Sequence, residues 1–350
     1  MIGRHQVTYF VKRVAARLLY AVGLLHVWQS IVLRRRAVVL MYHRVLTPDE
    51  RRAAGSHPAL IVDRDTFARQ MAFVKRHFTV LSIAQFAAHV EHRRPFPPSS
   101  CIITFDDGWR DNYANAVPIL AGLRLPSLIF LPMNYIGQPR VFWQEALVQL
   151  LGCAIALVRQ HADRRPAIDA LLAPVGLSAV LDIADAEPKP ELIAVVTMQK
   201  HLTRERVERL VADLAMTLEV SQQQLSVADG FINWQQVEEM RRRGVSFGGH
   251  GIDHLLLTHV DEATVEAEVT GSKHELDARL GELVPTFSYP NGYCTPGVAA
   301  TVRNAGYKLA FIAQGGPVTC DDDPWTLRRV NIHQNSDTEP LFLARLLGLF

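Results

Sequence analysis

Two adjacent carboxylates directly follow a short apolar run in the first third of the chain. The run Cys101–Phe105 reads CIITF, and Asp106, Asp107 and Gly108 come next. Two like charges held side by side need a cation or a proton to relieve their repulsion, so such a pair at a strand end is a candidate for metal binding or acid–base chemistry. The same residue types also form ordinary acidic surface turns. A second set of polar groups is needed to decide between these interpretations.

Two histidines supply that second set. The segment Gly249–His254 reads GHGIDH and places His250 and His254 four residues apart after another apolar run. Side chains at this spacing can bind one ion, although solvent-facing histidines and histidines bonded within a core are also common. Together, Asp107, His250 and His254 offer one carboxylate and two imidazoles, which leaves positions on a divalent ion open for water and substrate. That ligand set is typical of a hydrolytic metal site rather than a structural one.

The apolar runs that precede these groups predict the elements that position them. Short continuous apolar runs are typical of strands buried in a parallel sheet. They occur at Ala37–Tyr42, Cys101–Phe105, Ser127–Leu131, Val245–Phe247, Pro285–Tyr289 and Lys308–Ile312. Between them, Thr66–Phe78 and Asp261–Leu280 have the three- and four-residue apolar spacing of helices, the second with Asp261 as its N-cap. This alternation predicts an α/β fold, a parallel sheet or barrel covered by helices.

The middle of the chain breaks the alternation. Residues 141–230 contain helical patterns at Phe142–Gln160 and Thr203–Leu218 and no chemical motif. We expect a helical insertion there, within a single domain that spans residues 37–350. Its expected contribution is to shape access to the site rather than to perform the reaction.

Composition and charge limit the classes of partner. The 350 residues are 49% hydrophobic and 21% charged, which excludes a disordered chain and a polytopic membrane protein. The formal net charge is +2, too balanced to indicate nucleic acid as the ligand. The four cysteines, at positions 101, 153, 294 and 320, form no CxxC pair, which argues against a disulfide framework and favours a reducing compartment.

The first 36 residues carry a separate signal. An apolar stretch, Val14–Leu33, lies between Lys12-Arg13 and the run Arg34–Arg36. A signal peptide is disfavoured because no small-residue cleavage site follows, and a spanning helix is disfavoured because Arg17 and His26 lie inside the stretch. The interpretation we favour is an amphipathic helical segment over residues 1–36 that lies on the inner membrane face or packs on the domain. With no cleavable signal, the expected location is cytoplasmic, in association with that membrane face.

Several motifs together resemble a known family. TFDDGWRDNYANAVPIL, GVSFGGHGIDHLLLTH, and FSYPNG followed by NAGYKLAF are similar to the first three motifs of the polysaccharide deacetylases of the NodB-homology class, carbohydrate esterase family 4. LMYHRV near residue 43 and LRRV near residue 329 resemble elements of an exopolysaccharide-associated bacterial branch. The resemblance covers about residues 38–333. It implies a distorted (β/α) barrel, commonly of seven strands, and metal-dependent removal of acetyl groups from N-acetylated sugars.

The resemblance also implies a role for individual residues. Asp106 corresponds to the general base, and the metal ligands correspond to Asp107, His250 and His254. The backbone N–H of Asn291 corresponds to a donor to the oxyanion. In the exopolysaccharide-associated branch the general acid lies near the start, which implies His43; His333 is the rival if the chain keeps the unpermuted order.

The chain departs from the family pattern in three places. Ser288 stands where many members have an arginine that orients the base, and Arg328 or Arg329 is the candidate replacement. Gly251 stands where the family usually has Ser or Thr, so a hydrogen bond that supports the metal loop is expected to be missing. No segment matches the fourth motif. Trp109, Trp143 and Trp325 have the chemistry to stack on sugars but are more often core residues.

We therefore expect a metal-dependent deacetylase whose partner is an N-acetylated glycan, either a polysaccharide or its lipid-linked precursor. The alternative is a non-catalytic carbohydrate-binding or scaffold protein of an exopolysaccharide assembly, which the arginine missing at Ser288 would favour. The resemblance favours zinc as the cofactor, while one Asp with two His also suits Co, Ni, Mn or Fe.

Overall fold

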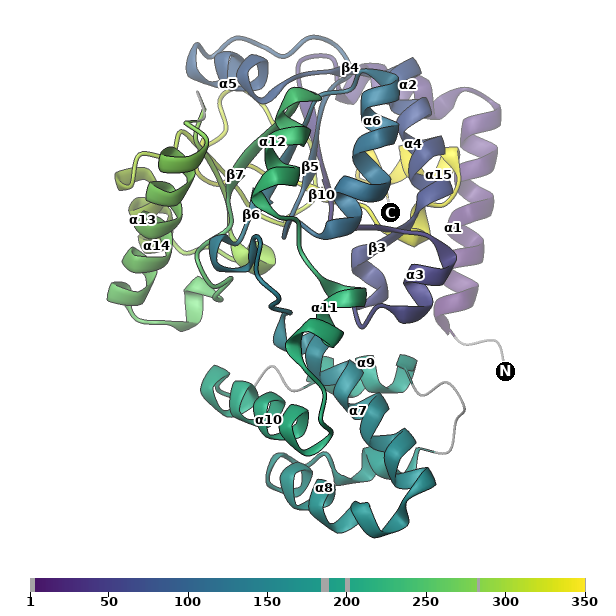
Figure 1. The fold of residues 1–350 in the computed structure, drawn as a ribbon. Coiled ribbons are helices and arrows are strands. Elements are labelled where there is room, and N and C mark those ends of the chain that lie inside the picture. Colours follow the sequence, from purple (N-terminus) through teal and green to yellow (C-terminus); the bar gives the residue numbers. More distant parts are fainter. Residues whose placement is uncertain (1–3, 184–188, 199–201, 282–283, 350) are drawn as a thin grey trace. The chain divides into compact units, whose positions relative to one another are not determined.

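The structure, a computed structural model, describes residues 4–183, 189–198, 202–281 and 284–349. Its centre is a parallel sheet (Figure 1). The strand order is β10, β1, β5, β6, β7, β8, β9. The strands are β1 (Ala37–Tyr42), β5 (Ser100–Phe105), β6 (Ser127–Leu131), β7 (Val245–Gly249), β8 (Thr286–Ser288), β9 (Leu309–Phe311) and β10 (Val330–Asn331). A short strand, β4 (Thr79–Val80), pairs with β5 off this path.

The sheet curls into a half-barrel. Every neighbouring pair along the path is parallel, from β10 on β1 to β8 on β9. A single bridge between Phe311 of β9 and Leu327 links the far edge to the segment that leads into β10. The α/β fold with seven strands in a distorted barrel is thus confirmed, with β8 and β9 shorter than the apolar runs that predict them.

Burial on both faces explains why these runs form strands. β1, β5 and β6 are buried along their whole lengths. A parallel strand has its side chains covered on one face by the barrel interior and on the other by helices, so a continuous apolar sequence suits it. Separately, β2 (Arg44–Leu46) and β3 (Ile61–Asp63) form a two-stranded parallel sheet.

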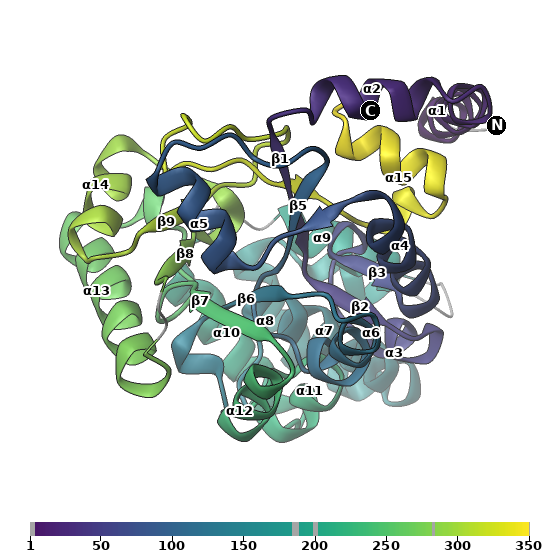
Figure 2. The same ribbon diagram turned by 90° about the horizontal axis from the view of Figure 1, so that it is seen from above.

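Helices surround the curled sheet (Figure 2). They are α1 (Arg4–Ala21), α2 (Leu24–Val32), α4 (Arg64–His77), α5 (Ile83–Glu91), α6 (Val117–Leu123), α12 (Trp234–Arg242), α13 (Glu262–Arg279), α14 (Pro296–Asn304) and α15 (Glu339–Leu346). α4 and α13 are the two helices expected from the apolar spacing, and the Asp261 side chain caps α13 by accepting the N–H of Thr264 at 2.8 Å. The cap satisfies one of the backbone donors that a helix start leaves free.

The two N-terminal helices are the described part of the chain that comes nearest to a membrane-spanning segment. In the described part of the chain no single helix combines the length and apolar character needed to cross a membrane, whereas Tyr9–Ala21 and Leu24–Val32 meet that criterion only as a pair bent by 86°. Both helices belong to the same compact unit as the sheet.

A second compact unit consists of residues 48–57 and 138–231. Its helices are α3 (Pro48–Ala53), α7 (Trp143–Gln160), α8 (Arg165–Leu172), α9 (Lys189–Met198), α10 (Arg204–Thr217) and α11 (Gln222–Asp229). α7 and α10 occupy the stretches with helical spacing, and both bury leucines in one apolar cluster. The N–H of Gly55 donates to the Asp229 carboxylate at 2.8 Å, which ties the two segments of this unit together.

Candidate active site

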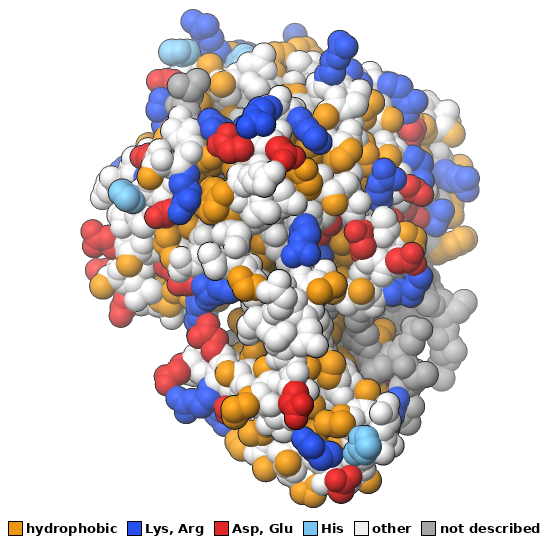
Figure 3. All heavy atoms as spheres, viewed as in Figure 1, with side chains coloured by type: hydrophobic (Ala, Val, Ile, Leu, Met, Phe, Trp, Pro, Cys, Tyr) orange, Lys and Arg blue, Asp and Glu red, His pale blue; other side chains and the backbone are white. Residues whose placement is uncertain are grey.

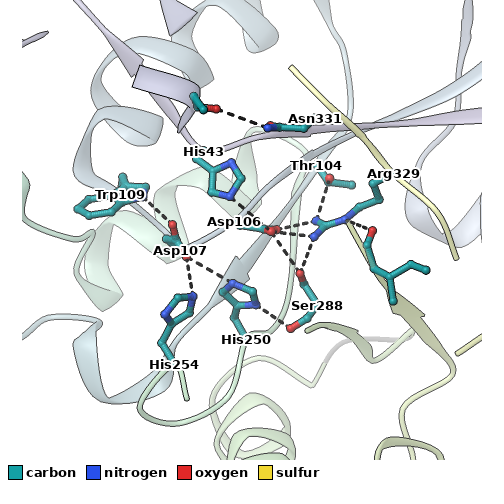
Figure 4. Close-up of polar contacts among 12 residues, drawn as sticks. His43, Thr104, Asp106, Asp107, Trp109, His250, His254, Ser288, Arg329 and Asn331 are labelled. Carbon is teal, nitrogen blue, oxygen red and sulfur yellow. Dashed lines mark hydrogen bonds and ion pairs between the residues drawn. The ribbon is translucent and has the colours of Figure 1, made fainter. Parts of the chain in front are cut away.

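The candidate residues meet where the parallel strands end. His43 follows β1, Asp106 and Asp107 follow β5, His250 follows β7, and Ser288 is the last residue of β8. Because parallel strands bring their carboxyl ends to the same rim, residues far apart in sequence converge there. Figure 4 shows their side chains pointing toward one another.

Asp107, His250 and His254 form a compact set of donors. Oδ1 of Asp107 lies 3.4 Å from Nε2 of His250 and 3.3 Å from Nε2 of His254. Tetrahedral ligands about 2.1 Å from a zinc ion lie about 3.4 Å from one another. Oδ1 of Asp107 is also buried without a hydrogen-bond partner, which is costly unless a cation satisfies it. The three residues therefore fit a divalent metal ion.

Two surrounding groups orient these donors. The indole N–H of Trp109 donates to Oδ2 of Asp107 at 2.9 Å, which leaves Oδ1 directed at the histidines. Nδ1 of His250 lies 2.6 Å from the carbonyl oxygen of Ser288. A carbonyl can only accept, so the proton is on Nδ1 and the lone pair is on Nε2, as a metal ligand requires. Trp109 is fully buried, which places it beneath the site rather than on a sugar-binding surface.

The backbone of this set is unusual. Asp107 has φ of 74° and His254 has φ of 55°, both in the left-handed region that residues with a side chain seldom adopt. Such conformations cost free energy and persist where the surrounding fold imposes them, most often at functional sites. Asp107 lies in the turn that follows β5, and His254 lies in the loop that follows β7.

The protonation states of Asp107 and His254 suit metal binding. Burial by itself would raise the pKa of Asp107, but the nearby rings of His250 and His254 outweigh it and hold that pKa below its usual range. Burial lowers the pKa of His254 to about 4. An ionised carboxylate and a neutral imidazole are the forms that bind metals. For His250, burial would lower the pKa, but Asp106 and Asp107 outweigh it and raise it.

Asp106 is held by a buried guanidinium. Arg329 is fully buried and donates from Nη1 to Oδ1 of Asp106 at 2.6 Å and from Nη2 to Oδ2 at 2.8 Å (Figure 4). Burial alone would raise the pKa of Asp106, but the positive charge of Arg329 outweighs it and lowers that pKa. The carboxylate is therefore ionised and fixed in orientation.

The ion pair of Arg329 with Asp106 supplies the arginine that is missing at Ser288. Arg329 directly precedes β10, and its Nη2 also donates to Oγ of Ser288 at 2.8 Å. Arg328 instead faces outward, where its side chain is 42% exposed and pairs with Asp322 at 3.0 Å. Of the two candidates, Arg329 is thus the one that contacts the carboxylate, and the serine leaves room for it.

The two candidate general acids lie in different surroundings. Nε2 of His43 lies 3.9 Å from Oδ2 of Asp106, and its Nδ1 is buried without a hydrogen-bond partner. Burial lowers the pKa of His43. Nδ1 of His333 accepts the N–H of Asn335 at 3.3 Å and caps a short turn. Of the two histidines, His43 is therefore the one that lies beside Asp106.

Asn291 lies on the loop after β8. Its side chain is exposed and its φ is 58°, in a turn closed by the N–H of Gly292 donating to the Tyr289 carbonyl at 2.7 Å. It lines a cavity of about 600 Å³ together with Tyr293, Gln314 and Arg328. Its part in an oxyanion hole stays a prediction.

The metal loop has a support that the sequence did not indicate. The Glu268 carboxylate, buried on α13, accepts the N–H of Ile252 at 2.9 Å and that of Asp253 at 3.0 Å. A Cβ on Gly251 would lie 2.7 Å from this carboxylate, so a serine or threonine there would collide with it. Glu268 thus occupies the space that the family's hydroxyl residue would take, and it holds the loop between His250 and His254.

Glu268→Gln should weaken metal binding by roughly 10- to 100-fold, as loss of groups that orient metal ligands generally does. The amide keeps the volume of the side chain but loses the charge and one of the acceptors that bind the loop. Isothermal titration with zinc measures the effect. Glu266→Gln, an exposed position on the same helix, is the control; equal affinities in the two variants would show that Glu268 does not support the loop.

Comparisons with known sequences agree with this site. The family model of the polysaccharide deacetylases matches residues 201–310, a stretch that includes His250, His254 and Ser288. YxkH of Bacillus subtilis (strain 168), a protein assigned to the polysaccharide deacetylases, is 26% identical over 98 residues. That alignment covers 28% of this chain and 35% of YxkH, so it spans about a third of the relative's length.

Solved structures share the fold over most of the chain. PplD, a deacetylase of Streptococcus pyogenes solved in complex with acetate, has a TM-score of 0.54 at 18% identity and covers 86% of this chain and 96% of its own. IcaB from Ammonifex degensii has a TM-score of 0.56 at 17% identity, with 89% and 97% covered. A de-N-acetylase from Aggregatibacter actinomycetemcomitans has a TM-score of 0.53 at 14% identity, with 89% and 99% covered.

Proposed function

We propose, from the match of residues 201–310 to the family model of the polysaccharide deacetylases, that this chain is a metal-dependent hydrolase of N-acetyl groups. Its substrate would be the sugar units of a polysaccharide or of its lipid-linked precursor, in exopolysaccharide or cell-envelope glycan metabolism. One observation carries the proposal: the metal-binding set of Asp107, His250 and His254 lies next to Asp106, a carboxylate kept ionised by Arg329. A ligand set beside a fixed base is the arrangement that hydrolysis of an amide needs.

Asp107, His250 and His254 would hold the ion. When bound, a divalent ion supplies positive charge that polarises an acyl carbonyl and lowers the pKa of a nearby water. One carboxylate and two imidazoles suit zinc, and also Co, Ni, Mn or Fe. The orienting contacts of Trp109 and of the Ser288 carbonyl would hold the ligands in place with or without substrate.

Asp106 is the proposed general base. Its carboxylate is ionised, is only 3% exposed, and is held by two hydrogen bonds from Arg329, so it can accept a proton from the attacking water. Arg329 acts as a positioning residue for this carboxylate. It also keeps the base ionised in a buried site, where a carboxyl group alone would tend to be neutral.

His43 is the proposed general acid for the leaving amine. It lies next to Asp106, at the same rim as the metal-binding set. Because burial lowers its pKa, the protonated ring is a stronger acid than a free imidazolium, and proton transfer from it to an amine is downhill. Asn291 remains the proposed donor to the oxyanion through its backbone N–H.

A cavity on the Asn291 side offers the chemistry that a sugar needs. It has a volume of about 600 Å³, and its walls combine polar and apolar side chains. Tyr293 lies on its wall with its side chain 64% exposed, which leaves an aromatic face open for stacking on a sugar ring. Gln314 and Arg328 supply hydrogen-bonding groups beside it. We therefore assign the bound glycan to this side of the rim.

The structure weakens the case for a non-catalytic scaffold protein. That alternative rests on the arginine missing at Ser288, and Arg329 fills the same place from another part of the chain. A binding module has no use for an ionised carboxylate beside a metal site.

The test of the proposed function is acetate release from oligosaccharides of N-acetylglucosamine with different linkages, next to O-acetylated counterparts. The zinc-loaded protein should release acetate from at least one N-acetylated substrate, lose this activity after treatment with a chelator, and regain it on addition of zinc. Asp107→Ala is the matched negative control. Release that is unaffected by the chelator, or acetate only from O-acetylated sugars, would refute the proposal.

The choice of general acid is tested separately. His43→Ala should lower kcat by about 10²- to 10⁴-fold while the bound metal is unchanged, because general acid catalysis contributes that much. His333→Ala should stay near the wild-type rate. Metal content by atomic absorption and acetate release are measured on both proteins; an inactive His333→Ala beside an active His43→Ala would place the acid late in the chain.

A further inference from the structure

The two N-terminal helices expose an unusual amount of apolar surface. Among the described residues, fourteen large hydrophobic side chains are exposed, and nine of them lie between residues 10 and 31. They are Phe10, Val11, Val14, Leu18, Val22, Leu24, Val27, Trp28 and Ile31. We call this set the N-terminal apolar face. A contiguous apolar surface of this kind marks an interaction site.

The spacing places these side chains on one side of each helix. On α1 they recur at Phe10, Val14 and Leu18, four residues apart; on α2, Leu24, Trp28 and Ile31 are four and three residues apart. Residues at these intervals lie above one another on a helix surface. Each helix thus has a continuous apolar stripe that no part of the described chain covers.

The opposite sides of the same helices are fixed to the domain. The Tyr9 hydroxyl of α1 donates to Asp337, just before α15, at 3.0 Å. The Tyr20 hydroxyl donates to Glu339, the first residue of α15, at 3.1 Å. Gln29 of α2 is buried and donates to the His77 carbonyl at 3.0 Å. Figure 2 shows α1 and α2 along one side of the half-barrel, next to α15. Helices anchored sideways by polar contacts are arranged to lie along a surface rather than to cross it.

The charge of residues 1–36 indicates which kind of partner the N-terminal apolar face would bind. Residues 1–36 contain seven Lys and Arg residues and neither Asp nor Glu. Arg17 is exposed on α1, and Arg34, Arg35 and Arg36 are exposed directly after α2. By contrast, the face seen in Figure 3 intermingles basic and acidic side chains. An apolar stripe on a segment whose own charged residues are all basic is complementary to a membrane with anionic headgroups.

We propose that α1 and α2 form a docking surface that lies in the plane of an anionic lipid membrane. The N-terminal apolar face enters the boundary between headgroups and acyl chains, and the arginines pair with lipid phosphates. This inference does not depend on the proposed hydrolase function.

Docking through α1 and α2 would determine where the candidate active site lies relative to the membrane. The carbonyl of Leu33, at the end of α2, accepts the N–H of Ser99 just before β5 begins. The arginine run therefore lies at the starting ends of the strands, whereas His43 and Asp106 lie at their far ends. Over the seven residue-to-residue steps from Arg36 to His43 an extended chain advances about 23 Å. The docked arginine run thus lies at the opposite end of the barrel from the rim that holds the candidate site.

Sedimentation with vesicles tests the docking surface. The full chain should bind vesicles that contain phosphatidylcholine with 30 mol% phosphatidylglycerol, bind pure phosphatidylcholine far more weakly, and dissociate as salt is raised. Leu18→Gln/Ile31→Gln should reduce binding at least roughly tenfold through lost apolar burial. Met216→Gln/Val227→Gln, which removes two apolar side chains elsewhere that are at least as exposed, is the matched control and should bind like the wild type.

A second variant tests the charges. Replacing Arg34, Arg35 and Arg36 with Gln should weaken binding to the anionic vesicles by roughly 100-fold, at about fivefold for each basic residue near the surface. Circular dichroism shows that each variant is folded. Failure of the wild type to bind, or unchanged binding by Leu18→Gln/Ile31→Gln, would overturn the proposal. A wild-type dimer by light scattering that this variant abolishes would instead assign the face to a second copy of the chain, and would also overturn it.

Discussion

Asp106→Asn is expected to retain its metal and to lose acetate release by about 10²- to 10⁴-fold, the usual contribution of a general base. The amide has nearly the volume of the carboxylate and still offers an oxygen to Arg329, but it cannot take a proton from water. Asp106 lies outside the metal-binding set of Asp107, His250 and His254, so the affinity for zinc should change little.

The neighbouring residue provides the contrast. Asp107→Asn removes the charge from Oδ1, the oxygen that faces both histidines, and should therefore weaken metal binding and activity together. Zinc affinity from calorimetry and kcat from acetate release separate the two behaviours. If Asp106→Asn releases acetate near the wild-type rate, the assignment of the base is wrong; if it loses zinc as Asp107→Asn does, Asp106 is a ligand.

Arg329→Met is expected to lower the free energy of unfolding by about 3–5 kcal/mol, because it leaves a buried carboxylate without its partner. Asp106 is 3% exposed and Arg329 is fully buried, so water cannot replace the two hydrogen bonds between them. Methionine fills a similar volume, which limits the effect of an empty cavity. Urea denaturation of the metal-free protein measures the change.

Two further variants show whether the loss comes from the charge. Arg328→Met removes an adjacent arginine whose ion pair with Asp322 is partly exposed, and should cost about 1 kcal/mol or less. The double variant Asp106→Asn/Arg329→Met removes both members of the buried pair and should recover more than half of the stability lost in Arg329→Met. A double variant as unstable as Arg329→Met would show that packing, rather than the unpaired charge, causes the loss.

The sequence by itself determined the sheet and the metal-binding set. Six strands of the parallel sheet coincide with short apolar runs, so their composition identifies them without any knowledge of their neighbours. The two-residue strands β4 and β10 carry no such run and were not predicted. The chemical groups follow these runs within a few residues: Asp106 and Asp107 after one strand, His250 and His254 after another. Because all parallel strands end at one rim, a local pattern was enough to predict that these side chains meet.

The tertiary structure alone decided which arginine and which carboxylate support that set. Successive side chains of an extended segment point in opposite directions, so one of Arg328 and Arg329 must face inward, and only the pairing of β10 with β1 determines that it is Arg329. Glu268 reaches the metal loop from a helix that begins eight residues after His254, through packing that no local motif encodes. The same holds for the N-terminal apolar face: the sequence shows that α1 and α2 are apolar and basic, but which side of each helix is left uncovered depends on how they pack against α15, a contact between opposite ends of the chain.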